Sequence, residues 1–152
     1  MPRRRKAWRK FSARMKKFHD EAVEKIVKEP GILGIEGLRS EKLLYPPIKF
    51  PQLKKEGQET GDIILIWSSL PGEWEILVAE VKIGARRHPG KDFLKLKFTF
   101  NYLKNCWRKW FESIKLNLPE GYTLWIRTVS LSYAGKALWE QPFKSEKRIR
   151  IF

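Results

Sequence analysis

The amino-acid sequence predicts an α/β domain in which helices cover a mixed sheet, and three observations support this fold class. Apolar residues recur at spacings of three and four over two long segments, about residues 6–29 and 93–114, as in amphipathic helices. Two strongly apolar segments between them meet at a short turn, and "YTLWIRTVSLSY" after the second helix is rich in β-branched and aromatic residues. A chain of 152 residues holds one hydrophobic core, so residues 1–152 are expected to form a single domain.

The first helix is expected to end at Pro30 and Gly31. Residues 31–50 are Gly-spaced and then Pro-interrupted, which predicts one strand followed by an irregular extended segment. The apolar stripe of the first helix consists of Trp8, Phe11, Met15, Phe18, Ala22 and Ile26.

Two strands are predicted at residues 62–68 and 74–83, joined by a turn at Pro71 and Gly72. Both are apolar on both faces, which is typical of strands in the middle of a sheet. Asp92 is expected to cap the second helix, whose Trp107 and Trp110 fit a core or a dimer interface. A strand is expected at 122–133, and the alternating tail "KRIRIF" is compatible with an edge strand.

The composition indicates a polyanionic partner, with nucleic acid as the first choice. The formal charge is +15, from 32 Lys and Arg against 17 Asp and Glu. The single cysteine, Cys106, excludes a disulfide framework within the chain and a zinc finger. No apolar segment reaches membrane-spanning length, so a cytoplasmic location with no membrane partner is expected.

Three charged residues stand in the apolar hairpin, where burial is costly unless charges are paired or hold a metal. Asp62 opens the first strand, whereas Glu80 and Lys82 lie two apart and therefore share one face of the second. Antiparallel pairing about the turn places position 62 near 80 or 82. Two carboxylates beside an ammonium suit Mg²⁺ or Mn²⁺. In the alternative interpretation, Glu80 and Lys82 pair across an exposed face and Asp62 caps a turn after Gly61.

Asp62 and the later Glu80-Val81-Lys82, on the second and third strands of the predicted order, resemble the PD-(D/E)XK nuclease superfamily. This superfamily includes restriction endonucleases and archaeal Holliday-junction resolvases. The resemblance covers roughly residues 8–132 and implies a restriction endonuclease-like αβββαβ core. The chain departs from the motif in having Gly61 where the family name has Pro.

The resemblance also implies roles for these residues. Asp62 and Glu80 would hold one or two Mg²⁺ (or Mn²⁺) ions, with the backbone carbonyl of Val81 as a further ligand. Lys82 would orient the attacking water, help to deprotonate it and offset charge on the scissile phosphate. Many members place another acid on the first helix, for which Glu21 is the candidate and Glu24 nearly as good. His19 is expected at the edge of the core.

Two basic groups are candidates for binding phosphates. One belongs to "ARRHPGK" directly after the motif, and the other is a basic N-terminal arm of residues 1–7. Solvated, mobile segments are the alternative for both, and a basic amphipathic first helix on an anionic membrane is a less favoured one. The candidate residues are Arg86, Arg87 and Lys91 in the first group and Arg3, Arg4 and Arg5 in the second.

These features predict a Mg²⁺-dependent endonuclease that hydrolyses DNA, directed by the structure of junction or branched substrates. A homodimer is expected because cleavage of two strands requires two sites, and no small-molecule cofactor is expected. The first alternative is a catalytically inactive basic nucleic-acid-binding protein of the same fold. A weaker alternative is an RNA-binding factor.

Overall fold

The computed structural model of the chain describes residues 2–51, 53, 60–83, 89–133 and 143–152. For residues 2–12, 15, 83, 89–94, 132 and 133 it describes the backbone alone. The two helices are α1 (Pro2–Lys28) and α2 (Pro89–Ser113). The strands are β1 (Ile48–Lys49), β2 (Ile63–Leu70), β3 (Glu73–Ile83), β4 (Thr123–Tyr133), β5 (Lys144–Ser145) and β6 (Ile149–Arg150).

Within the described residues, six strands form one mixed sheet, which confirms the predicted α/β class. The order is β1-β2-β3-β4-β5, and β6 also pairs with β4. β2 and β3 are antiparallel about the turn at Pro71 and Gly72, as predicted. β3 and β4 run parallel from Glu73↔Thr123 to Ile83↔Tyr133, and α2 makes the crossover between them. The chain's last residues pair antiparallel with β4, as the alternating tail suggested.

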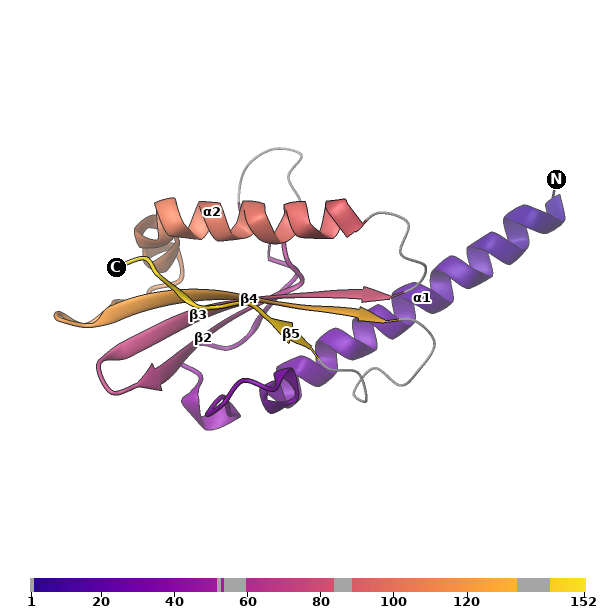
Figure 1. Cartoon of the computed structure of the whole chain (residues 1–152). Helices are drawn as coiled ribbons and strands as arrows, with labels where there is room; N and C mark the ends of the chain where they lie inside the picture. Colours follow the sequence, from indigo (N-terminus) through magenta and orange to yellow (C-terminus); the bar gives the residue numbers. More distant parts are fainter. Residues whose placement is uncertain (1, 52, 54–59, 84–88, 134–142) are drawn as a thin grey trace.

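The two helices cover opposite faces of the sheet (Figure 1). Side chains alternate along β2, so that Ile63 and Leu65 pack on the α1 side while Ile64 and Ile66 pack on the α2 side. This explains why β2 and β3 are apolar on both faces. Trp107 and Trp110 of α2 are each only 8 % exposed and belong to the core on their side.

Three local predictions were wrong. The strand expected early in residues 31–50 is replaced by two 3₁₀ turns (Pro30–Leu33 and Ser40–Lys42) and the two-residue β1. Gly34 and Gly37 adopt positive φ angles of 72° and 80°, which break an extended strand. α2 begins at Pro89, so Asp92 lies inside its first turn and is no N-cap. The basic arm is also no separate segment, because residues 2–7 are the first turns of α1.

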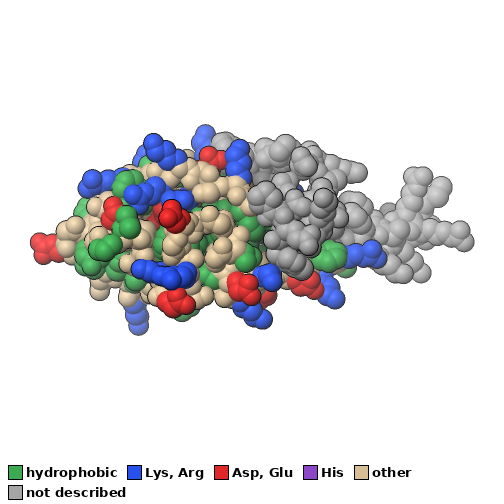
Figure 2. Space-filling model, turned by 60° about the horizontal axis from the view of Figure 1, so that its bottom comes forward, with side chains coloured by type: hydrophobic (Ala, Val, Ile, Leu, Met, Phe, Trp, Pro, Cys, Tyr) green, Lys and Arg blue, Asp and Glu red, His purple; other side chains and the backbone are tan. Residues whose placement is uncertain are grey.

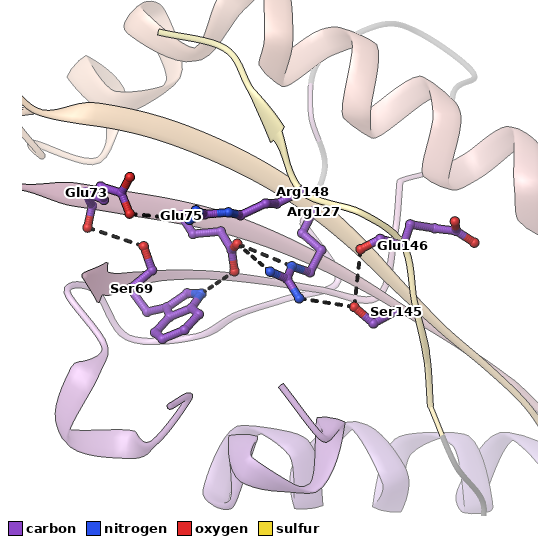
Figure 3. Close-up of polar contacts among 8 residues, drawn as sticks. Ser69, Glu73, Glu75, Arg127, Ser145, Glu146 and Arg148 are labelled. Carbon is purple, nitrogen blue, oxygen red and sulfur yellow. Dashed lines mark hydrogen bonds and ion pairs between the residues drawn. The ribbon is translucent and has the colours of Figure 1, made fainter. Parts of the chain in front are cut away.

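A buried polar cluster joins β2, β3 and β4 on the α1 side of the sheet (Figure 3). Glu75 is fully buried, and its Oε2 accepts a 2.8 Å hydrogen bond from Trp67 Nε1. Its Oε1 lies 3.2 Å from Arg127 Nη2, and Arg127 Nη1 donates a hydrogen bond to the Ser145 hydroxyl of β5. Burial raises the pKa of Glu75 above 4.5, against the lowering effects of Arg127 and Trp67. The cluster ties the C-terminal strands to the centre of the sheet.

In the part of the chain that the structure describes, neither helix has the length and apolarity needed to cross a membrane.

Candidate functional site

Asp62 lies immediately before β2, at the point where the β2–β3 ladder ends. Its backbone N–H donates to the Ala79 carbonyl at 2.9 Å, and its Oδ2 accepts from the Val81 N–H at 2.7 Å. The last ladder pair is Ile63↔Ala79, and Asp62 beyond it bonds to the backbone on either side of Glu80. The Asp62 carboxylate thus takes the place of a backbone acceptor and is held against the Glu80-Val81-Lys82 segment.

Glu80 and Lys82 lie on the α2 face of β3, since they continue the alternation of Ile76 and Val78. Only 4 % of the Glu80 side chain is exposed, and its Oε1 lies 3.9 Å from the Lys95 Nζ of α2. The Asp62 carboxylate is therefore bonded to the backbone between Glu80 and Lys82, and α2 adds an ammonium group beside Glu80. The sequence pattern gave no signal for Lys95, because its position depends on how α2 crosses the sheet.

His19 of α1 contacts Asp62 from the other side of the sheet. Its Nε2 lies 3.0 Å from Asp62 Oδ1, and its Nδ1 lies 3.5 Å from Asp20 Oδ1. The hydrogen bond to Asp62 is the main cause that raises the pKa of His19 above 6.5, and burial opposes it. The charge of Glu80 also raises this pKa, so the two carboxylates and the imidazole share one electrostatic environment. His19 is thus more than a residue at the edge of the core.

The raised pKa of His19 predicts a pH-dependent contribution to stability. A group whose pKa is higher in the folded state stabilises the fold below its unfolded pKa, near 6.5, and loses this contribution as pH rises through the folded value. We expect His19→Ala in EDTA to lower the free energy of unfolding by about 1.5–3 kcal/mol at pH 5.5, the range for hydrogen bonds to charged groups. Urea denaturation of the wild type and of His19→Ala at pH 5.5 and at pH 9 measures this loss of unfolding free energy. A loss equal at both pH values would contradict the assignment.

The candidate first-helix acids do not join the site. Glu21 is exposed and, with Lys25, lines a shallow groove on the outer side of α1. Glu24 forms an ion pair with Lys49 of β1. The physical reason is helical phase, because Ala22, Val23 and Ile26 turn toward the sheet and His19 belongs to the same stripe. The assignment of Glu21 is corrected accordingly, and the first-helix residue against Asp62 is His19.

Gly61 and Thr99 fix the backbone directly before Asp62. Thr99 of α2 is fully buried, and its Oγ1 accepts a 3.1 Å hydrogen bond from the Gly61 N–H and donates to the Lys95 carbonyl at 2.9 Å. A Cβ at position 61 would stand 2.7 Å from Val78 Cγ1 and 3.3 Å from the Ala79 carbonyl oxygen. A proline at position 61 would lack the N–H that donates the hydrogen bond to Thr99 Oγ1. The departure from the motif at Gly61 therefore has a structural reason.

We expect Gly61→Ala to lower the free energy of unfolding by about 1–3 kcal/mol, the usual cost of overpacking a tight site. Thermal or urea denaturation measures the loss. Gly31→Ala is the matched control, because a Cβ there meets only the Leu38 carbonyl oxygen at an ordinary 3.6 Å. Equal stability of the two variants would show that the backbone at position 61 moves freely away from β3.

The phosphate-binding candidates stay predictions. Arg86 and Arg87 lie outside the described residues. Lys91 lies in the first turn of α2, and Arg3, Arg4 and Arg5 lie in the first turns of α1, where only the backbone is described.

The donor chemistry of the site fits a hard divalent cation. Asp62 and Glu80 offer carboxylate oxygens with only 12 % and 4 % of their side chains exposed. The N–H and C=O of one residue in a strand point to the same side, so the Val81 carbonyl faces the side of β3 on which Asp62 accepts the Val81 N–H. Within the described ranges, no group of three or more His, Cys, Asp and Glu side chains could hold a metal. Any ion would therefore depend on these two carboxylates and backbone oxygen.

Comparisons with protein-family models, with curated proteins and with solved structures found no match for this chain.

Proposed function

We propose that the chain is a divalent-metal-dependent endonuclease that hydrolyses DNA phosphodiester bonds on a restriction endonuclease-like core. The observation that carries this proposal is the 2.7 Å hydrogen bond from the Val81 N–H to Asp62 Oδ2. It holds the acid before β2 against the Glu80-Val81-Lys82 segment, which is the grouping that this chemistry needs. The order α1, β1, β2, β3, α2, β4, with β3 and β4 parallel, supports the αβββαβ core.

Asp62 and Glu80, with the Val81 carbonyl, would hold Mg²⁺ or Mn²⁺. When bound, such an ion lowers the pKa of a water molecule and polarises a phosphoryl oxygen. Lys82, on the same face as Glu80, orients the attacking water and offsets charge on the scissile phosphate. His19 fixes the orientation of the Asp62 carboxylate through its 3.0 Å contact. Lys95 adds a second ammonium beside Glu80.

The substrate is DNA bound through its phosphates, because a net charge of +15 favours a polyanion. Figure 2 shows Lys and Arg side chains distributed over the described part of one face, interspersed with fewer acids. Junction or branched DNA suits a compact chain, and a homodimer would supply two sites for two strands. No small-molecule cofactor is required. Phosphates flanking the cleaved bond would meet the predicted basic residues, which are Arg86, Arg87, Lys91, Arg3, Arg4 and Arg5.

A basic nucleic-acid-binding protein of the same fold without catalysis is the second candidate. The observation that favours it is that both Asp62 oxygens are engaged, one by the Val81 N–H and the other by His19. In that case the charged residues would serve only to hold the strands and helices together, and binding would not depend on a divalent ion.

The deciding experiment incubates the wild-type protein with linear, supercoiled and four-way-junction DNA and with structured RNA, in Mg²⁺, Mn²⁺ or EDTA. We expect cleavage of DNA in the divalent ions only, leaving 5′-phosphate and 3′-hydroxyl ends. Binding to DNA without cleavage of any of these substrates would overturn the nuclease and leave the inactive binding protein.

A further inference from the structure

The N-terminal half of α1 carries the densest positive charge of the chain and extends past the sheet. The residues of α1 that reach the core, Ala22, Val23 and Ile26, all belong to its second half among the described side chains. Figure 1 shows the first half projecting beyond the ends of β3 and β4. Residues 3–17 contain no acid and carry these basic residues: Arg3, Arg4, Arg5, Lys6, Arg9, Lys10, Arg14, Lys16 and Lys17.

This projecting half is one helix with the part that reaches the candidate site. α1 continues unbroken from Pro2 to Lys28. His19, in its middle, contacts Asp62, and the cations that precede it with described side chains, Arg14, Lys16 and Lys17, are exposed. At a rise of 1.5 Å per residue, Arg3 lies about 24 Å along the helix from His19. The basic residues therefore stand at distances from the site that the helix fixes.

We propose that this segment, the basic half of α1 (residues 3–17), docks along duplex DNA on one side of the cleaved bond. The inference rests on the proposed function and names its substrate class, which is DNA with a duplex flank. Duplex DNA rises about 3.4 Å per base pair, so 24 Å corresponds to about seven base pairs. The protein needs a flank of about this length next to the bond that it cleaves.

Charge complementarity identifies duplex DNA as the occupant. Duplex DNA carries one negative charge per ~1.7 Å of its axis, so the roughly 21 Å between residues 3 and 17 faces about a dozen phosphates. The segment offers a comparable number of cations and no acid. Only the first half of α1 could bind to a membrane surface, because the apolar residues of the second half are already buried in the core. Membrane binding would also give no role to the candidate site around Asp62 and Glu80, which adjoins this helix.

The first test measures how binding to a 30-base-pair duplex depends on salt, in EDTA. The variant Arg3→Gln/Arg4→Gln/Arg5→Gln/Lys6→Gln should reduce the slope of log K against log[salt] by about 3.6, at roughly 0.9 for each of four lost phosphate contacts. The affinity change between 50 and 200 mM salt would then shrink on the order of a hundredfold. The matched control removes four exposed lysines elsewhere, Lys104, Lys109, Lys115 and Lys147. Equal slopes in the two variants would overturn the proposal.

The second test separates a docked helix from a flexible basic tail. Ala13 is exposed, and Ala13→Pro keeps every charge but breaks the helix between the six basic residues of positions 3–10 and His19. We expect at least a tenfold loss of affinity for the 30-base-pair duplex and no loss for the control Ala13→Gln. Wild-type affinity of Ala13→Pro for this duplex would overturn the docked helix.

Vesicles of phosphatidylserine and phosphatidylcholine provide the membrane arm of the test. Vesicle binding that depends on Arg3 to Lys6, with duplex binding that does not, would replace the proposal with a membrane surface. All binding is measured in EDTA, so its outcome is read independently of cleavage. A protein that binds as expected but never cleaves would refute the nuclease and leave the docking of duplex DNA in place.

Discussion

Asp62→Asn, Glu80→Gln and Lys82→Ala are each expected to lower the rate of Mg²⁺-dependent DNA cleavage by at least about a hundred- to a thousandfold, the range for losing one preorganised charged or polar group. Asn and Gln keep the shape of each side chain but remove the negative charge that would attract a divalent ion. The amide oxygen introduced by Asp62→Asn can still accept the Val81 N–H, which Asp62 Oδ2 accepts at 2.7 Å. Affinity for the same DNA in EDTA should change by less than about threefold, because phosphate binding depends on other cations.

Single-turnover cleavage with saturating protein measures the chemical step, and filter binding in EDTA measures affinity. Glu21→Gln is the matched control, since it removes a carboxylate from the exposed side of α1. It should cleave at the wild-type rate. Cleavage by Asp62→Asn at the wild-type rate, or an equal loss in Glu21→Gln, would show that the candidate site is not where hydrolysis occurs.

Much of the fold could be predicted because its central elements carry strong periodic patterns. The hairpin of β2 and β3 follows from two apolar segments around Pro71 and Gly72, and α2 follows from its apolar stripe. The segment before the hairpin could not be predicted so well. Its turns depend on Gly34 and Gly37 at positive φ, and β1 on a short pairing with β2. Such features depend on the neighbours that the chain meets in space.

The residues of the candidate site also differ in how well the sequence indicated them. Asp62, Glu80 and Lys82 could be selected as candidates because strand alternation and one hairpin predict that their positions are neighbours, and the structure contains that hairpin. His19 could not, because its contact with Asp62 depends on where α1 crosses the sheet. Glu21 was the expected first-helix acid because it is acidic and lies well before the end of the helix. Helical phase would have selected His19, one turn before Ala22 and Val23, the first buried residues of the helix among the described side chains.

The buried polar cluster was not predicted, because Glu75 and Arg127 are 52 positions apart and meet only through the parallel pairing of β3 and β4. Breaking this cluster is expected to have a large effect on the stability of the fold. We expect Glu75→Ala to lower the free energy of unfolding by about 3–5 kcal/mol, the usual cost of removing one partner of a buried ion pair. The Arg127 guanidinium and the Trp67 N–H, both bonded to Glu75, would lose their acceptor. Urea denaturation at pH 7 measures this loss.

Two further variants separate the ion pair from simple loss of packing. Glu73→Gln is the control, because Glu73 forms a 3.4 Å ion pair with Arg148 that is only partly buried. It should cost at most about 1 kcal/mol. The double variant Glu75→Leu/Arg127→Met should recover much of the stability lost in Glu75→Ala, since apolar residues can replace a buried pair. A loss below about 1 kcal/mol in Glu75→Ala would mean that water reaches the cluster.

The pH dependence supplies an independent check on Glu75. Burial raises its pKa in the folded state, so folding takes up a proton between pH 4.5 and the raised value. The contribution of Glu75 to stability is therefore greatest below pH 4.5 and falls as pH rises through that window. Glu75→Gln, which cannot ionise, should remove this part of the pH dependence while keeping an acceptor for Trp67. An unchanged pH profile would show that Arg127 offsets the burial of the carboxylate completely.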